Sequence, residues 1–239
     1  MTRQALILAA GMGSRLRPLT DSRPKALVAC GGRPLVAHAL DHLRDGGVTD
    51  VVVVVGHGAE ALTAYLGRRT DPRVRFVVNP DYATTNTLAS VACAAPAVDG
   101  DFFLLDGDVV FEPGVLGALG GAGTSVAVDR DRPLDDDAVK VTVESNRIAR
   151  IGKELPPGAR GWAESIGFAR IDRATGEQLF PMCQALLRAG ARQAYYEAAF
   201  QRLIDDGAIL RPADVTGKKW VEIDDHADLR RAESLFVAA

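Results

Sequence analysis

A basic segment that follows two glycines near the N-terminus is well suited to phosphate chemistry. Residues 15–25 contain four cations, Arg15, Arg17, Arg23 and Lys25. Gly11 and Gly13 come just before them. Glycines let the backbone bring its N–H groups close to an anion, while Arg and Lys add charge and hydrogen bonds to phosphate oxygens. The segment therefore predicts a phosphate-binding loop rather than a glycine turn with solvated arginines.

Two common phosphate-binding motifs do not match this segment. A dinucleotide-binding fingerprint requires a third glycine at position 16, which is Leu16, and a Walker A loop requires Gly-Lys followed by Ser or Thr. A hydride-transferring enzyme with a dinucleotide cofactor is therefore the least favoured function.

Two acidic segments, far apart in the sequence, each accompany an apolar run. Asp106-Gly107-Asp108 follows residues 102–105, and Asp224 and Asp225 end the run that starts at Val221. Magnesium prefers oxygen ligands and usually takes one or two protein carboxylates together with substrate phosphates and water. A lone Asp after a strand is more often a turn former or a helix N-cap. Two such segments beside a phosphate-binding loop instead favour a metal site with one carboxylate from each.

Alternating strands and helices are predicted to position these residues. Short apolar runs predict strands at residues 5–8, 51–55, 74–78 and 102–105. Apolar residues at three- and four-residue spacing predict helices at residues 35–44, 59–66 and 87–95. Five consecutive valines at 51–55 are typical of a parallel strand buried on both faces. The chain is therefore predicted to have an α/β fold with a doubly wound, mostly parallel sheet, which binds ligands at the carboxyl ends of its strands.

The pattern changes after residue 126. Residues 139–144 and 147–151 alternate polar and apolar side chains around Ser145-Asn146, which predicts an antiparallel hairpin. Further strands are predicted at residues 164–171 and 221–224, and helices at residues 175–189, 193–205 and 227–236. Pro181 would start or kink part of the first of these helices. Without a repeat or linker, we expect one domain over residues 1–239, with an antiparallel elaboration in its second half.

The composition is that of an ordinary globular protein. The chain has 239 residues, of which 47% are hydrophobic and 25% charged. Its net charge of −3 gives no reason to expect nucleic acid or an anionic membrane as a partner. Cys30, Cys93 and Cys183 are odd in number and lie far apart, which argues against a disulfide framework or a zinc site. We expect a cytoplasmic monomer or homodimer.

The basic segment resembles a known signature. Residues 8–16 read LAAGMGSRL and residues 23–27 read RPKAL. Together they resemble the signature of the nucleotidyltransferases that activate sugar phosphates and phosphoalcohols, and the resemblance runs from residue 4 to about 235. It implies a Rossmann-like, GT-A-like fold in which Arg15 holds the β- and γ-phosphates of a nucleoside triphosphate and Lys25 contacts phosphate during transfer. It also implies that Asp108 and Asp224 bind Mg²⁺.

Other segments resemble one branch of that family, the bacterial phosphocholine cytidylyltransferases and their relatives that act on inositol 1-phosphate or 2-aminoethylphosphonate. In residues 82–90, Asn86, Thr87 and Ser90 carry hydrogen-bonding groups suited to a pyrimidine or a ribose, although ordinary helix capping would explain them equally well. The resemblance implies that the nucleotide is bound by Leu8, Ala10, Gly11, Met12, Gly13, Ser14, Arg15, Asn86, Thr87, Ser90 and Asp106.

The same branch implies an acceptor site in the second half of the chain. Lys153 would bind the acceptor phosphate, unless it is a solvated lysine of the hairpin. The other residues expected to contact the acceptor are Trp162, Glu164, Tyr195 and Tyr196. They could form an aromatic and acidic box for an ammonium group, and a polyol could use Glu164 equally well. Their aromatic members could instead belong to the core.

The sequence therefore predicts a Mg²⁺-dependent cytidylyltransferase that transfers CMP from CTP to a small phosphate or phosphonate. Residues up to about 130 would bind the nucleotide, and the rest would bind the acceptor and supply the second metal ligand. The nearest alternative is a sugar-1-phosphate nucleotidylyltransferase that uses UTP, dTTP or GTP. A more remote one is a catalytically silent nucleotide-binding regulatory protein, which would need fewer of Arg15, Lys25, Asp108 and Asp224.

Overall fold

The computed structural model describes residues 2–236. Its strands are β1 (Gln4–Ala9), β2 (Ala29–Cys30), β3 (Arg33–Pro34), β4 (Asp50–Val55), β5 (Arg73–Val78), β6 (Phe102–Asp106), β7 (Val109–Phe111), β8 (Thr124–Asp129), β9 (Lys140–Glu144), β10 (Arg147–Gly152), β11 (Ala163–Ile171), β12 (Leu210–Asp214) and β13 (Trp220–Glu222). Its helices are α1 (Leu35–Asp45), α2 (Ala59–Leu66), α3 (Thr87–Cys93), α4 (Gly114–Ala118), α5 (Arg173–Arg188), α6 (Glu197–Asp205) and α7 (His226–Phe236), with short 3-10 turns η1 (Ser14–Leu16), η2 (Lys25–Leu27) and η3 (Ala95–Ala97).

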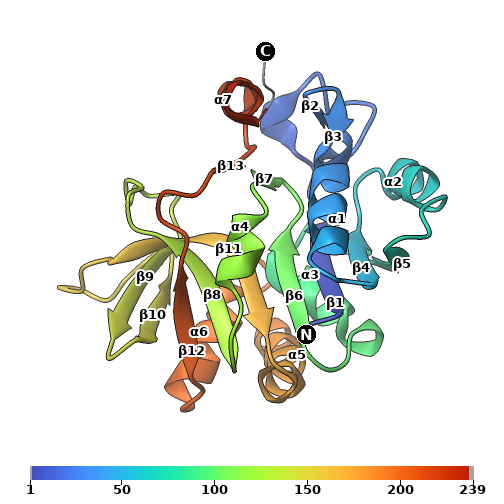
Figure 1. The fold of residues 1–239 in the computed structure, drawn as a ribbon. Coiled ribbons are helices and arrows are strands. Elements are labelled where there is room, and N and C mark those ends of the chain that lie inside the picture. The colour runs from blue at the N-terminus through green and yellow to red at the C-terminus, as the bar shows by residue number, and fades with distance from the viewer. Residues whose placement is uncertain (1, 237–239) are drawn as a thin grey trace.

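The first half of the chain forms the parallel part of a nine-stranded sheet (Figure 1). Strand β1 lies between β4 and β6 and is parallel to both, and β5 continues the sheet beside β4. Leu8 is paired with Asp106, so the loops after β1 and β6 leave the sheet at the same edge. This edge is where open α/β sheets bind their ligands.

The second half adds antiparallel strands to the other side of β6. The long strand β11 pairs with β6, β8 and β9, and β10 completes the hairpin with β9. Two short strands, β7 and β13, form a separate antiparallel pair in which Val109 is opposite Glu222. Ile223 N donates to Asp108 O at 3.0 Å. This small pair therefore brings the two acidic segments together, although more than 100 residues separate them.

Two hydrophobic cores lie on opposite faces of the sheet. Leu6 and Leu8 of β1 point into the core that α3, α5 and α6 cover, whereas Ala5, Ile7 and Ala9 point into the core beneath α1 and α2. Because successive residues of a strand face opposite sides, an uninterrupted apolar strand such as β1 or β4 can serve both cores at once. The two cores hold the loop edge of the parallel strands in place.

The predicted α/β fold with a mostly parallel sheet is confirmed, with differences at a few elements. The strands β7, β8 and β12 were not expected. The last strand ends at Glu222 rather than at 224, because the N–H groups of Asp224 and Asp225 donate to the Asp228 carboxylate in the first turn of α7. Helix α6 begins at Glu197 rather than at 193, since backbone carbonyls just before it accept hydrogen bonds from the start of α3.

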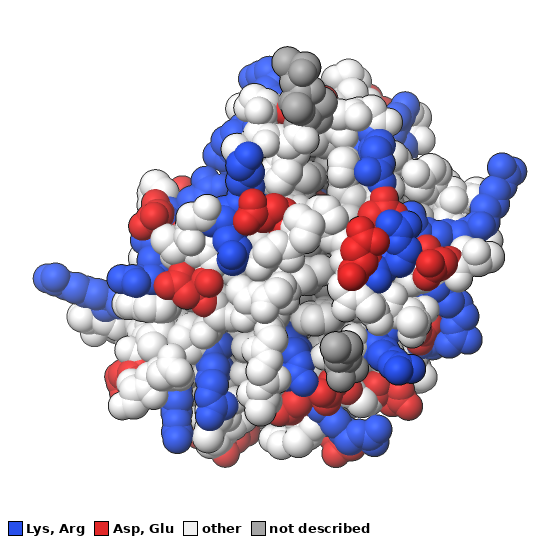
Figure 2. Space-filling model, viewed as in Figure 1, with Lys and Arg blue, Asp and Glu red and all other residues white. Residues whose placement is uncertain are grey.

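The surface carries charges of both signs. On the face drawn in Figure 2, Lys and Arg side chains are interspersed with Asp and Glu, without a broad region of one sign. Within residues 2–236, no helix combines the length and the apolar character needed to cross a membrane.

Candidate active site

A cleft of about 630 Å³ opens at the carboxyl ends of β1 and β6. Its volume is in the range of small-molecule sites. Most of the predicted site residues line it: Leu8, Ala10, Gly11, Gly13, Ser14, Arg15, Lys25, Asn86, Thr87, Ser90, Asp106, Asp108, Lys153, Glu164, Tyr195, Tyr196 and Asp224. Met12 and Trp162 are not among the lining residues. The structure therefore places the glycine loop, both acidic segments and Lys153 around one space.

The glycine loop is held in a tight turn between β1 and η1. Gly13 has a φ of 60°, in the left-handed region that favours glycine, and a Cβ there would lie 2.9 Å from Cβ of Lys25. The Thr20 hydroxyl donates to Gly13 O at 2.9 Å, and Leu16 anchors the turn in the core. The loop is thus fixed against the segment that carries Lys25, which keeps both parts at the cleft.

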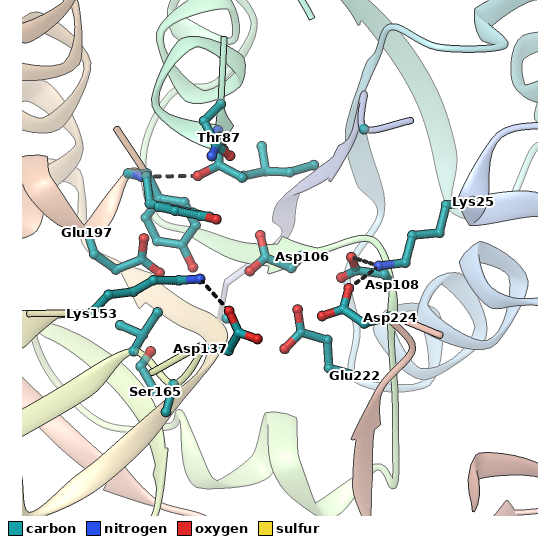
Figure 3. Close-up of a pocket in the computed structure, with 18 of the residues that line it drawn as sticks. Lys25, Thr87, Asp106, Asp108, Asp137, Lys153, Ser165, Glu197, Glu222 and Asp224 are labelled. Carbon is teal, nitrogen blue, oxygen red and sulfur yellow. Dashed lines mark hydrogen bonds and ion pairs between the residues drawn. The ribbon is translucent and has the colours of Figure 1, made fainter. Parts of the chain in front are cut away.

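The Lys25 ammonium bridges the two acidic segments. Its Nζ donates to Asp108 Oδ2 at 2.7 Å and to Asp224 Oδ1 at 2.8 Å (Figure 3). Arg15 also pairs with Asp224, with 2.8 Å between Nη2 and Oδ2. Burial opposes the charged form of Lys25, but the two carboxylates outweigh it and raise its pKa. The two acids therefore form a strong cation site that a protein ammonium fills in this structure.

Glu222 completes an acidic cluster that the sequence did not single out. Carboxylate oxygens of Asp108, Glu222 and Asp224 lie within 4.8 Å of one another, and Asp108 Oδ1 has no hydrogen-bond partner among the residues that the structure describes. Desolvation, followed by the charges of Asp108 and Asp224, raises the pKa of Glu222, although the residue is exposed to solvent. An all-oxygen cluster with an unpartnered buried oxygen fits a divalent cation such as Mg²⁺. The sequence signal for Glu222 was its two-residue spacing from Asp224, because alternate residues near a strand end face the same side.

Asp106 lies at the centre of the cleft under close steric constraint. Gly167 of β11 has a φ of 76°, and a Cβ at this position would lie 2.3 Å from Asp106 Oδ2. Burial, followed by the charge of Asp108, raises the pKa of Asp106 well above its ordinary value. In the described part of the chain, Asp106 Oδ1 has no hydrogen-bond partner. Asp106 is therefore positioned to act as a hydrogen-bonding group in the cleft.

The three residues expected on the base side also have structural hydrogen bonds. The Asn86 side chain caps α3 by accepting from Thr87 N at 2.8 Å, and Thr87 Oγ1 accepts from Tyr196 N at 3.1 Å. Ser90 is buried, and its Oγ is 3.2 Å from Nδ2 of Asn79, a cleft residue that the sequence did not single out. These bonds hold the start of α3 against the cleft and leave the Asn86 amide group and the Thr87 hydroxyl hydrogen free to donate.

Lys153 lies at the opposite end of the cleft, just after β10. Its Nζ is 3.5 Å from Asp137 Oδ1 and lies 4.7 Å from the centroid of the Tyr195 ring. Burial opposes the charged form of Lys153, but Tyr195 and Asp137 outweigh it and raise its pKa. The cleft thus has a second cationic end, separate from the Arg15 and Lys25 end.

The structure does not form the predicted aromatic box. Trp162 lies outside the cleft, where the Arg130 guanidinium lies 5.0 Å from the centroid of its ring. The Tyr196 side chain is 1% exposed, and its ring packs edge-on against Phe200. Trp162 immediately precedes β11, and it does not line the cleft although Glu164, two residues later in that strand, does. Of the predicted aromatic residues, Tyr195 is the exposed one that lines the cleft.

Two acids, the predicted Glu164 and the unselected Glu197, also line the acceptor end. Glu197, the first residue of α6, lies beside Lys153 (Figure 3) and has an oxygen without a hydrogen-bond partner. Burial raises its pKa to about 7. Burial likewise raises the pKa of Glu164 to about 7, against the opposing charge of Arg132. The segment Tyr195-Tyr196-Glu197 resembles the cytidylyltransferase branch, but the burial of Glu197 depends on how α6 packs against the hairpin.

Known proteins resemble this chain in sequence and fold. The family model of the MobA-like NTP transferase domain matches residues 5–155. A CMP-5'-(3-aminopropyl)phosphonate synthase from Streptomyces rubellomurinus is 39% identical over 98% of this chain and 38% of its own length. A bifunctional IPC transferase and DIPP synthase from Rubrobacter xylanophilus is 32% identical over 98% of this chain and 52% of its own length. The chain thus spans less than two thirds of these two relatives.

A solved structure shows the same fold. The inositol-1-phosphate CTP transferase from T. maritima superposes with a TM-score of 0.80 at 26% identity, covering 100% of this chain and 98% of the other. The match covers both the parallel half and the antiparallel half, so the elements that form the cleft are common to the two folds. This chain therefore belongs to the MobA-like NTP transferase family.

Proposed function

We propose that the chain transfers CMP from CTP to a small phosphate or phosphonate acceptor, such as phosphocholine or 2-aminoethylphosphonate, and releases pyrophosphate. One observation carries the proposal: a single cleft joins the glycine loop, the acids that Lys25 bridges, and the second cationic end at Lys153. A nucleotide transfer needs a site for a triphosphate, a site for an anionic acceptor and a cation between them. The CTP and CMP in the names of two similar proteins support the choice of nucleotide.

The nucleotide would lie along the first half of the cleft. The loop at residues 10–14 would surround its phosphates, and Arg15 and Lys25 would turn from Asp224 to phosphate oxygens. Asn86 and Thr87 would donate to the base or the ribose, since both keep donors free at the cleft. We assign residues 1 to about 130 to nucleotide binding within one domain, and residues from about 131 to 239 to acceptor binding.

The acidic cluster would hold Mg²⁺. Asp108 and Asp224, with Glu222 beside them, offer the oxygen ligands, and the unpartnered Oδ1 of Asp108 supports this use. The bound cation would neutralise charge on the nucleotide phosphates. The Lys25 ammonium contacts both aspartates, so a positive charge is already stabilised at this position.

The transfer itself would need no protein base. An acceptor phosphate or phosphonate is already anionic at neutral pH, so one of its oxygens can attack the α-phosphorus of CTP directly. The new bond joins that oxygen to the α-phosphorus, and the bond to the β-phosphate oxygen breaks, which releases pyrophosphate. Lys153 would hold the attacking group, while Arg15 and Lys25 would stabilise the leaving pyrophosphate.

A panel of substrates tests this proposal. Pyrophosphate release would be measured with CTP, UTP, dTTP and GTP, each with phosphocholine, 2-aminoethylphosphonate or glucose 1-phosphate. We expect turnover with CTP and one of the first two acceptors. Turnover only with glucose 1-phosphate and another nucleotide would identify a sugar-1-phosphate nucleotidylyltransferase instead. Tight CTP binding without turnover across the panel would point to a regulatory protein.

A further inference from the structure

A buried carboxylate in the acceptor half of the cleft forms no ion pair with the described residues. Glu197 is 5% exposed, and its Oε2 has no hydrogen-bond partner within residues 2–236. Within residues 2–236, the ion pair of the nearby Lys153 is with Asp137 and not with Glu197. A buried polar atom without a partner lowers stability, so native structures seldom keep one without a function. A ligand group that donates a hydrogen bond to Glu197 would remove this cost.

The charges around Glu197 indicate which ligand group this is. The cleft residues of this end include three cations, Arg132, Lys153 and Arg231, and four acids: Asp135, Asp137, Glu164 and Glu197. An acceptor that carries only a phosphate or phosphonate would pair with the cations and leave Glu197 without a partner. An acceptor that also carries a cation would satisfy both Lys153 and the acids.

The kind of cation follows from the aromatic residues. A quaternary ammonium group has no N–H to donate and is usually bound by several aromatic faces. Here Trp162 lies outside the cleft and the Tyr196 ring is in the core, so the predicted cage is absent from the described residues. Two other aromatic rings of the cleft already face protein cations: the Arg132 guanidinium lies 4.4 Å from the centroid of the Trp220 ring, and Lys153 Nζ lies 4.7 Å from that of Tyr195. A carboxylate oxygen without a partner instead matches an ammonium group with N–H donors.

We propose that the acceptor carries a primary ammonium group, which donates a hydrogen bond to Glu197 while Lys153 holds the phosphate or phosphonate. This inference rests on the proposed function, because it concerns the acceptor of the same reaction. The site has room for such a molecule. Lys153, Tyr195 and Glu197 line both the main cleft and an adjoining cavity of about 600 Å³ between β10 and α6.

Pairs of acceptors that differ only at the amine test the inference on the wild-type protein. With CTP, we expect kcat/KM to be at least about 30-fold higher for 3-aminopropylphosphonate than for propylphosphonate, since a site built for an N–H donor rejects an analogue that lacks it. We also expect phosphoethanolamine to exceed phosphocholine by at least about tenfold. Equal use of the amine and amine-free acceptors would overturn the inference and leave the proposed function standing.

Glu197→Gln tests the residue itself. We expect the ratio of kcat/KM between 3-aminopropylphosphonate and propylphosphonate to fall at least about tenfold. Glu177→Gln, which changes an exposed acid on α5, should keep the wild-type ratio. An equal loss with both acceptors would show that Glu197 only supports Lys153 or the fold, and would overturn the inference. If Glu197→Gln does not fold, the wild-type acceptor pairs still decide.

Calorimetry separates this inference from the proposed function. The two phosphonates would be titrated into wild-type protein that is saturated with CTP. Absence of turnover with every nucleotide, together with at least about tenfold tighter binding of the amine, would refute the proposed transfer and support the ammonium site. Equal affinities, or no binding of either compound, would overturn the ammonium site.

Discussion

Replacing Glu197 with Gln should make the protein more stable at alkaline pH. Burial raises the pKa of this carboxyl to about 7, from an ordinary value of 4.5. The folded state therefore binds the proton more tightly than the unfolded chain does. The contribution of Glu197 to stability is most favourable below pH 4.5, falls as the pH rises from 4.5 to about 7, and stays low above that. At about 1.4 kcal/mol per pKa unit, the difference corresponds to about 3 kcal/mol.

Glutamine keeps the shape of the side chain and cannot ionise. At about pH 8.5, the free energy of unfolding of Glu197→Gln should therefore exceed that of the wild type by up to about 3 kcal/mol, and near pH 4.5 the two should agree within about 1 kcal/mol. Urea unfolding followed by circular dichroism at a series of pH values gives both numbers. Glu177→Gln on the surface of α5 serves as the control and should follow the wild type. Parallel pH profiles for wild type and Glu197→Gln would refute the reasoning.

Four other substitutions test separate parts of the account. Gly167→Ala should lower the free energy of unfolding by roughly 2–4 kcal/mol, because the new Cβ would lie 2.3 Å from Asp106 Oδ2. The control is Gly32→Ala, where φ is a similar 77° and no described atom lies within 4 Å of the new Cβ. It should lower the free energy of unfolding by about 1 kcal/mol. In metal-free buffer, Lys25→Met should lower the free energy of unfolding by roughly 3 kcal/mol, because Asp108 and Asp224 lose the ammonium between them. Added Mg²⁺ should restore part of this stability, as measured by a thermal melt. Asp108→Asn should reduce kcat by at least about 1,000-fold in a pyrophosphate-release assay, whereas Asp136→Asn, outside the cleft, should stay near wild type. Trp162→Ala should change kcat/KM less than about twofold, because Trp162 does not line the cleft. A larger loss would indicate that Trp162 contacts the acceptor.

Features that depend on residues close together in the sequence were predicted best. Arg15 and Lys25 belong to one short segment, so their composition alone indicated a phosphate site. The partnership of Asp108 and Asp224 could be anticipated because both acids accompany apolar runs and the family resemblance selects these two as metal ligands. What brings them together, the pairing of β7 with β13, was not visible, because strands of three residues carry little periodic signal.

Burial and side-chain direction at non-local contacts could not be predicted. Trp162 looked like a member of an aromatic box, but whether a residue beside a strand faces the cleft depends on the register of β11 against β9. Glu197 was not selected as a site residue, and its burial arises where α6 packs beside the hairpin. A change of one residue in register reverses the side that a side chain faces. The direction of the Trp162 side chain and the burial of Glu197 could therefore be learned only from the three-dimensional structure.

The most direct test of the account is product analysis of a single reaction. Wild-type protein would be incubated with CTP, Mg²⁺ and 2-aminoethylphosphonate, and phosphorus NMR would follow the products. The account predicts that pyrophosphate and a CMP–phosphonate anhydride appear in equal amounts, and that neither appears with Asp108→Asn on the same time scale. Unchanged CTP in the wild-type reaction, or pyrophosphate formed without the CMP–phosphonate product, would contradict it.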